Sequence, residues 1–150
     1  MHDTILGKIK KNDDFYLAQI TYLSKIIKII IDPEEEKLLN QSIQITQELI
    51  SSIDKFDALS KEILVNELLE TYNDGWNSYD EVQDDGSTIT VTNPNLSKDE
   101  FISKLTLTSI MVSGEDCISL SYDDSDMFWG HQPTVTSNDG LDFSNAEVNI

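Results

Sequence analysis

The sequence predicts an α+β fold in a single domain, residues 1–150, with a mostly antiparallel sheet formed by N-terminal and C-terminal strands. Two long helices and one short helix are expected between these strands. The prediction depends on the order of patterns along the chain, because β-favouring runs come first, helical patterns follow, and β-favouring runs return. Alternating strand–helix units, which would predict a parallel sheet, are absent. A chain of 150 residues is long enough to bury one hydrophobic core.

Residues 1–31 are expected to form strands. Residues 5–9 make a short first run, and residues 15–23 are rich in aromatic and β-favouring side chains. Residues 26–31 are all isoleucine except for Lys28. Because an exposed run of this kind would favour aggregation, we expect both faces of this last strand to be covered.

Residues 32–72 are expected to form two helices. Asp32 is a suitable N-cap, Pro33 suits the first helical position, and Glu35 lies three residues after the cap. A second helix is expected to begin after Asp54. Apolar residues at helical spacing mark the buried side of each helix: Leu38, Leu39, Ile43, Leu49, Ile50 and Ile53 in the first, and Phe56, Leu59, Ile63, Leu64, Leu68, Leu69 and Tyr72 in the second.

Residues 73–96 are expected to form an acidic loop. Asn73-Asp74-Gly75 is a typical helix end, and the following residues are rich in Asp and Glu. A brief strand at Thr88–Thr92 and partial disorder are the alternatives within this loop.

The C-terminal part is predicted to begin with a short helix over residues 97–104. Ser97 and Glu100 have the spacing of a capping box. Residues 105–150 are expected to form strands, because two β-rich runs flank the turn signal at Ser113–Asp116 and indicate a hairpin. Further strands are predicted at Gln132–Thr136 and around Ala146–Val148.

The chain is strongly acidic, with a net charge of −18 and no arginine. Residues 1–61 contain 8 Lys against 10 Asp or Glu, whereas residues 62–150 contain 2 Lys against 18. Such a surface repels phosphate backbones and anionic membranes, so neither nucleic acid nor membrane is expected as a partner. It attracts metal ions or a basic protein surface. The simpler alternative is that the charge only maintains solubility.

A cytoplasmic location is expected from three features. The chain contains no run of 18 consecutive apolar residues, the length that a membrane span needs, and residues 1–4 do not resemble the start of a signal peptide. Cys117 is the only cysteine and has no internal disulfide partner, which favours a reducing compartment.

The densest group of chemically active side chains is Asp123, Asp124 and Asp126 followed by His131. Asp124, Asp126 and His131 could bind a divalent metal ion or act as an acid–base pair. Their spacing matches no diagnostic metal motif. The favoured interpretation is therefore a polar turn whose aspartates accept hydrogen bonds from backbone amides.

Trp76 and Trp129, with Phe128, could form an aromatic wall for a ligand. The favoured alternative is that they are core anchors. No nucleophile elbow, phosphate loop or Cys-x-x-Cys motif occurs, and His2 lies at the terminus, so histidine chemistry would depend on His131 alone. Catalysis is therefore the less favoured class.

Five segments of the chain match a known family: Glu67–Leu69, Tyr72–Trp76, Glu100–Phe101, Leu105–Ile110 and Asp123–His131. On these residues the protein resembles small bacterial proteins classed as a domain of unknown function, numbered twenty-two sixty-two. It departs from that pattern at Gln132-Pro133 and in a longer acidic segment between Tyr79 and Asn95. The resemblance implies a compact bacterial cytosolic α+β domain and carries no activity.

Two functions remain open from the sequence. The preferred hypothesis is an acidic, non-catalytic binding protein without a cofactor, an immunity- or antitoxin-like partner of a basic protein. Its candidate binding residues are Trp76, Asp123, Asp124, Asp126, Trp129 and His131. The alternative is a metal-dependent enzyme or metal-binding protein using Asp124, Asp126 and His131. The oligomeric state does not follow from the sequence.

Overall fold

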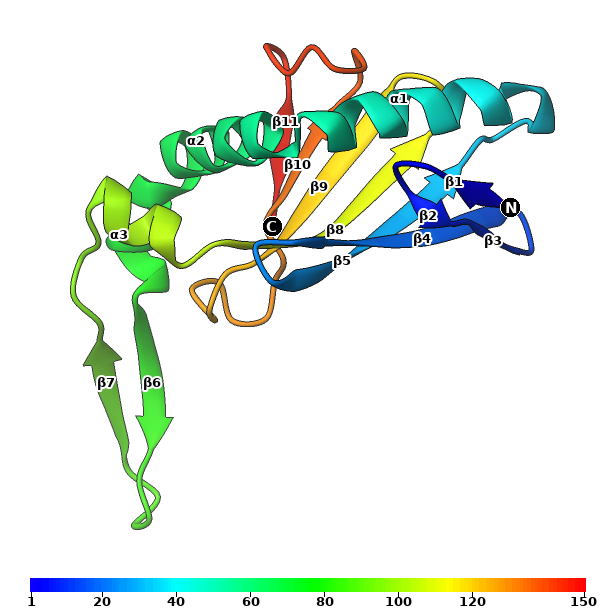
Figure 1. Ribbon diagram of the computed structural model, residues 1–150. Coiled ribbons are helices and arrows are strands. Elements are labelled where there is room, and N and C mark those ends of the chain that lie inside the picture. Colours follow the sequence, from blue (N-terminus) through cyan, green and yellow to red (C-terminus); the bar gives the residue numbers. More distant parts are fainter.

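The computed structural model describes residues 1–150 and has the predicted α+β fold (Figure 1). Its main sheet contains seven strands: β3 (Lys10–Asn12), β4 (Phe15–Tyr22), β5 (Lys25–Asp32), β8 (Thr106–Ser113), β9 (Cys117–Asp123), β10 (Thr134–Ser137) and β11 (Glu147–Asn149). The strand order is β11-β10-β9-β8-β5-β4-β3. All neighbours are antiparallel except β5 and β8, which are parallel because two helices lie between them in the chain.

The two long helices, α1 (Leu39–Ser51) and α2 (Ile53–Thr71), cover one face of this sheet (Figure 1). The core lies between the helices and the sheet, and its largest fully buried side chains include Phe101, Tyr122 and Phe128. None of the helices is both long enough and apolar enough to cross a membrane.

The central strand β5 is covered on one face only, so the expectation of two covered faces is wrong. Ile27, Ile29 and Ile31 are fully buried beneath the helices. Ile26 on the opposite face is 67% exposed, and Lys28 is exposed beside it. No helix packs on that face, and lysine makes the open face compatible with water.

Residues 5–9 do not form one strand. The chain instead makes a small separate sheet from β1 (His2–Asp3) and β2 (Gly7–Lys8), with a turn between them. The Asp3 carboxylate accepts hydrogen bonds from the backbone N–H groups of Ile5 and Leu6 at 2.8 Å each, which fixes this turn.

The first helix begins later than predicted. Asp32 is still part of β5, because it pairs with Ser113 of β8. The Asp32 carboxylate accepts from the N–H of Glu34, whose φ of 64° is incompatible with a helix. One 3₁₀ turn (Glu36–Leu38) then leads into α1.

The predicted acidic loop over residues 73–96 contains a second small sheet. After α2 the chain makes a single π-helical turn (Tyr72–Trp76) and then the antiparallel strands β6 (Ser78–Val82) and β7 (Thr88–Thr92). This hairpin extends away from the body on the side opposite to the long helices (Figure 1).

The short helix α3 (Lys98–Ser103) returns the chain to the core after the hairpin. It has the predicted capping box between Ser97 and Glu100, and it buries Phe101.

Candidate functional site

An aromatic cluster joins the π-helical turn to the Asp123–His131 segment. The ring of Trp76 lies 4.9 Å from that of Trp129, 5.3 Å from that of Phe128 and 5.9 Å from that of His131. Phe128 is fully buried, whereas Trp129 is 57% exposed. The structure therefore brings together the two tryptophans that the sequence singles out. Phe128 acts as a core anchor, and Trp129 faces solvent.

Asp124 shapes the turn that presents Trp129. Its carboxylate is buried and accepts hydrogen bonds from the N–H groups of Asp126 and Phe128, both at 3.0 Å. Burial raises the pKa of Asp124, and the two N–H donors oppose that shift. Asp126 and Trp129 have positive φ angles of 61° and 54°. Such conformations persist only where the surrounding structure holds them, so the buried Asp124 carboxylate is part of the support for the exposed indole.

The other polar residues of this segment have separate roles. Asp123 is exposed and accepts from the N–H of Ser125 at 3.0 Å. Asp126 is exposed beside the cluster, and the exposed His131 ring meets Trp76 edge-on. Asp124, Asp126 and His131 do not come together, and no group of three His, Cys, Asp or Glu side chains in the chain is placed to hold a metal ion.

The exposed side of the aromatic cluster is a groove of about 480 Å³. The sequence analysis singled out Trp76, Trp129 and Asp126 among its lining residues, whereas Tyr79 and Asn93 come from the hairpin and its root, which were not predicted. The groove is lined by Tyr72, Trp76, Tyr79, Asn93, Ser125, Asp126, Met127 and Trp129.

The hairpin extends one side of this groove. In the β6–β7 register, Tyr79 pairs with Val91 and Glu81 pairs with Ile89, so these four side chains share one face. Tyr79 also lines the groove, and we call this side of the hairpin the groove face. Tyr79 and Ile89 are 42% and 49% exposed. An apolar strip therefore runs from Trp129 through Tyr79 to Ile89, with Glu81 within it.

Asparagines fix the root of the hairpin. The buried Asn77 side chain donates to the carbonyl of Asn93 and to Oδ1 of Asn95, both at 3.0 Å. The Asn73 side chain donates to the carbonyl of Leu96 and accepts from its N–H, at 3.0 and 2.8 Å. The pattern Asn73-x-x-x-Asn77 around Gly75-Trp76 was the sequence signal for this anchoring. Asn73-Asp74-Gly75 by itself predicts only a helix end, because the partners of Asn73 and Asn77 lie 16 to 23 residues further along the chain.

The hairpin and half of the residues that line the groove lie in an acidic, lysine-free stretch of the chain. Between Lys61 and Lys98 there is no lysine, and eight Asp or Glu residues lie in that interval. They are Glu62, Glu67, Glu70, Asp74, Asp80, Glu81, Asp84 and Asp85.

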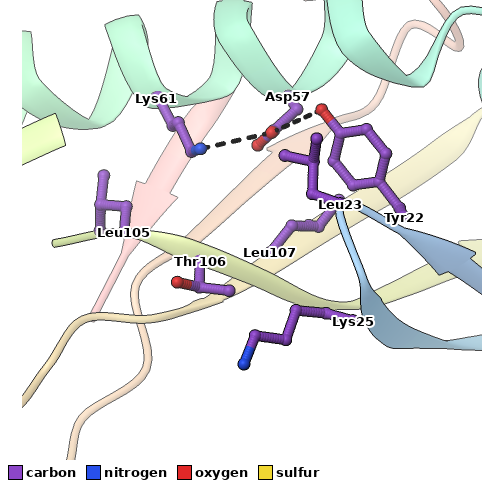
Figure 2. Close-up of a pocket in the computed structure, with 8 residues that line it drawn as sticks. All are labelled: Tyr22, Leu23, Lys25, Asp57, Lys61, Leu105, Thr106 and Leu107. Carbon is purple, nitrogen blue, oxygen red and sulfur yellow. Dashed lines mark hydrogen bonds and ion pairs between the residues drawn. The ribbon is translucent and has the colours of Figure 1, made fainter. Parts of the chain in front are cut away.

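A second, smaller cavity of about 190 Å³ lies between α2 and the start of β8 (Figure 2). The Asp57 carboxylate accepts hydrogen bonds from the hydroxyl groups of Tyr22 at 2.9 Å and Tyr122 at 2.7 Å. It also pairs with Lys61 Nζ at 3.3 Å. Figure 2 shows Tyr22 and Lys61 on either side of Asp57, while the Lys25 ammonium points away.

The polar groups of this second cavity satisfy one another. Burial and the neighbouring Asp57 carboxylate raise the pKa of both Tyr22 and Tyr122, so both phenols remain donors to Asp57. The remaining wall is largely apolar, with Leu23, Leu105 and Leu107. The arrangement joins α2 to strands β4 and β9, and we assign it a structural role.

Fold and site together define a small α+β protein whose exposed aromatic groove continues onto an acidic hairpin. A family model described as an uncharacterised protein conserved in bacteria (DUF2262) matches residues 3–148. The chain therefore belongs to this bacterial family, which confirms the resemblance seen in its sequence. Comparison with curated proteins and with solved structures gave no significant match.

Proposed function

We propose that the protein is an acidic binding protein that acts in the cytoplasm and docks a basic segment of a partner protein. The segment would lie in the Trp76–Trp129 groove and along the groove face of the hairpin. Neutralisation of a basic protein, as by an immunity protein or antitoxin, is the role that fits such a surface. The observation that carries the proposal is the exposed Trp129, held beside Trp76 at the root of an acidic hairpin.

The groove has the chemistry that favours cationic side chains. Tryptophan faces attract Lys and Arg, and exposed tryptophans in preformed pockets are frequent energetic centres of protein interfaces. Asp126 lies in the same groove as the two indoles. The surrounding acidic residues would accelerate the approach of a basic partner, and this contribution weakens as salt is added.

The hairpin supports the same conclusion. A two-stranded hairpin is at best marginally stable in water without further packing. Most residues of β6 and β7 are exposed, including Tyr79, Val82 and Ile89. Contact with a partner would cover this apolar surface and the free strand edges.

The test uses two short synthetic peptides, one alternating Lys with Leu and the other alternating Glu with Leu. Tryptophan fluorescence is titrated with each at low and at raised ionic strength. We expect the Lys peptide alone to bind, and more weakly at raised salt. Trp129→Ala should weaken its binding at least tenfold, a loss of about 1.4 kcal/mol or more.

Leu23→Ala is the matched control, because Leu23 is also highly exposed (71%) but lies in the β4–β5 turn. It should bind like the wild type. Equal binding of the two peptides, or binding that Trp129→Ala leaves unchanged, would contradict the proposal.

The metal alternative makes an opposite prediction. The Asp124 carboxylate is buried, already accepts two backbone N–H groups and does not form a group of three ligands with Asp126 and His131. We therefore expect millimolar Mg²⁺, Ca²⁺, Mn²⁺ or Zn²⁺ to leave the melting temperature unchanged in a background of 0.15 M NaCl. A ligand that binds only the folded state raises the melting temperature, so a clear increase would favour the metal alternative.

A further inference from the structure

The uncovered face of the sheet carries a cationic groove, in contrast to the rest of the molecule. Its volume is about 550 Å³, and no acidic side chain lines it. The polar part of its lining contains three lysines, and none of them belongs to an ion pair of the structure. The lining residues are Lys8, Lys10, Leu17, Ala18, Gln19, Ile26 and Lys28.

Strand alternation places these side chains together. Leu17 of β4 alternates with the buried Tyr16 and Ala18, and Lys28 of β5 alternates with buried isoleucines. Cross-strand pairing sets Lys10 beside Leu17 and Lys28 beside Gln19. We call this surface the lysine groove. It combines cations with an unusually exposed apolar side chain, since Ile26 is 67% exposed.

We propose that the lysine groove receives the acidic hairpin of a second copy of this chain. Asp80 lies on the hairpin face opposite to the groove face, Asp84 and Asp85 lie at the tip, and all three are exposed, which complements the three lysines of the groove. Val82 lies on the same face as Asp80, is 73% exposed and would pack against Leu17 and Ile26. The charge complementarity of these two surfaces selects a second copy as the occupant.

The shape of the molecule fits this contact. The hairpin projects to the side of the sheet that the helices leave uncovered, which is the side of the lysine groove (Figure 1). Charges separated by more than about 8 Å are largely screened at physiological salt, so the repulsion between two acidic copies counts less than the contacts inside the groove. The contact uses the hairpin face opposite to the groove face, and neither Trp129 nor Tyr79, so its surface is distinct from that of the function proposed above.

Charge reversal with complementation tests the contact. One variant carries Lys8→Glu, Lys10→Glu and Lys28→Glu, and a second carries Asp80→Lys, Asp84→Lys and Asp85→Lys. Sedimentation velocity over a range of concentrations should show association of the wild type and at least tenfold weaker association of each variant alone. An equimolar mixture of the two should associate again, because each hairpin then meets a groove of opposite charge.

Lys37→Glu, Lys55→Glu and Lys98→Glu together form the control, since they change the same number of charges outside the groove. Circular dichroism should show that every variant is folded. A wild type that stays monomeric at the highest concentration would overturn the proposal, as would a mixture that does not associate. Association that survives both reversals would place the interface elsewhere and would also overturn it.

Discussion

Asp57 is the residue on which the contact between α2 and the sheet most depends. Its buried carboxylate accepts from Tyr22 of β4 and Tyr122 of β9 and pairs with Lys61 one helical turn away. A buried charge costs stability unless it is fully hydrogen-bonded, and these partners meet that requirement. One side chain therefore ties a helix to two separated strands.

Asp57→Asn should destabilise the fold by about 2–4 kcal/mol, because it removes the charge that holds both phenols and the Lys61 ammonium. Urea denaturation at neutral pH measures the loss. Glu67→Gln is a matched control, because Glu67 is exposed on the same helix. It should change stability by no more than about 0.5 kcal/mol. Equal effects of the two substitutions would show that the Asp57 network contributes little.

The same network predicts a loss of stability at alkaline pH. The folded-state pKa values of Tyr22 and Tyr122 are raised above the ordinary 10.0. Above pH 10 the unfolded chain releases phenolic protons that the folded chain retains, so the free energy of unfolding falls as pH rises. Below pH 10 this contribution is fully present. Urea midpoints at pH 7, 9 and 11 should therefore decline mainly in the last interval.

Tyr22→Phe removes one of these titrating groups and should flatten the alkaline decline, although the variant is less stable at neutral pH. A decline as steep as that of the wild type would show that Tyr22 does not contribute to it.

Asp57 also shows why part of the structure could not be predicted from single residues. The helical pattern in α2 assigned Leu59 to the buried side, but Leu59 is 37% exposed, whereas Asp57 and Ser60 are buried. The spacing of apolar residues identifies the buried face of a helix only when all residues of that face are apolar. A buried polar residue is recognisable only with its partners, and Tyr22 and Tyr122 are 35 and 65 residues away.

At the scale of elements, sequence patterns predict the structure correctly where an interaction joins residues only a few positions apart. The capping box of Ser97 and Glu100 is formed as predicted. The first helix starts later than its cap-like sequence indicated, because pairing of Asp32 with Ser113 of β8 prolongs β5. That pairing joins residues far apart in the chain, so the pattern at Asp32-Pro33 alone could not reveal it.

The β6–β7 hairpin shows the same limit for the candidate site. The Thr88–Thr92 run was recognisable as a strand, but its partner contains Asp80 and Glu81, which have low strand propensity. Pairing brings Tyr79 and Asn93 into the groove. The sequence therefore predicted the two tryptophans and Asp126 of the groove but not the hairpin side.

Removal of the hairpin should leave the body folded. Replacing residues 78–92 with a short Gly-Ser linker removes no fully buried side chain. The free energy of unfolding from urea denaturation should therefore change by no more than about 1 kcal/mol. The variant should lose most Lys-peptide binding and all self-association. A variant that fails to fold would show that the hairpin is instead part of the folding unit.

At the scale of the whole molecule, charge is separated between two regions. Eight of the ten lysines lie in residues 1–61, and three of them line the lysine groove on the sheet. The hairpin and the aromatic groove lie in the half whose net charge is −16, from 2 Lys against 18 Asp or Glu. Both proposed contacts follow from this separation, since one pairs the acidic region with an external cationic segment and the other with the lysines of a second copy.

The same excess of acidic groups should make stability depend on ionic strength. Repulsion within a chain of net charge −18 opposes the compact state, and added salt screens it. We expect the free energy of unfolding to rise by about 1–2 kcal/mol between 10 mM and 300 mM NaCl, as an increase of about 2–8 °C in the melting temperature. KCl should give the same increase at equal ionic strength, because screening does not depend on the identity of a monovalent cation. Measurements at low protein concentration separate this effect from self-association, which would make the melting temperature concentration-dependent. A melting temperature that falls with NaCl would mean that attractive ion pairs outweigh the repulsion, so that the surface carboxylates stabilise the fold despite their number.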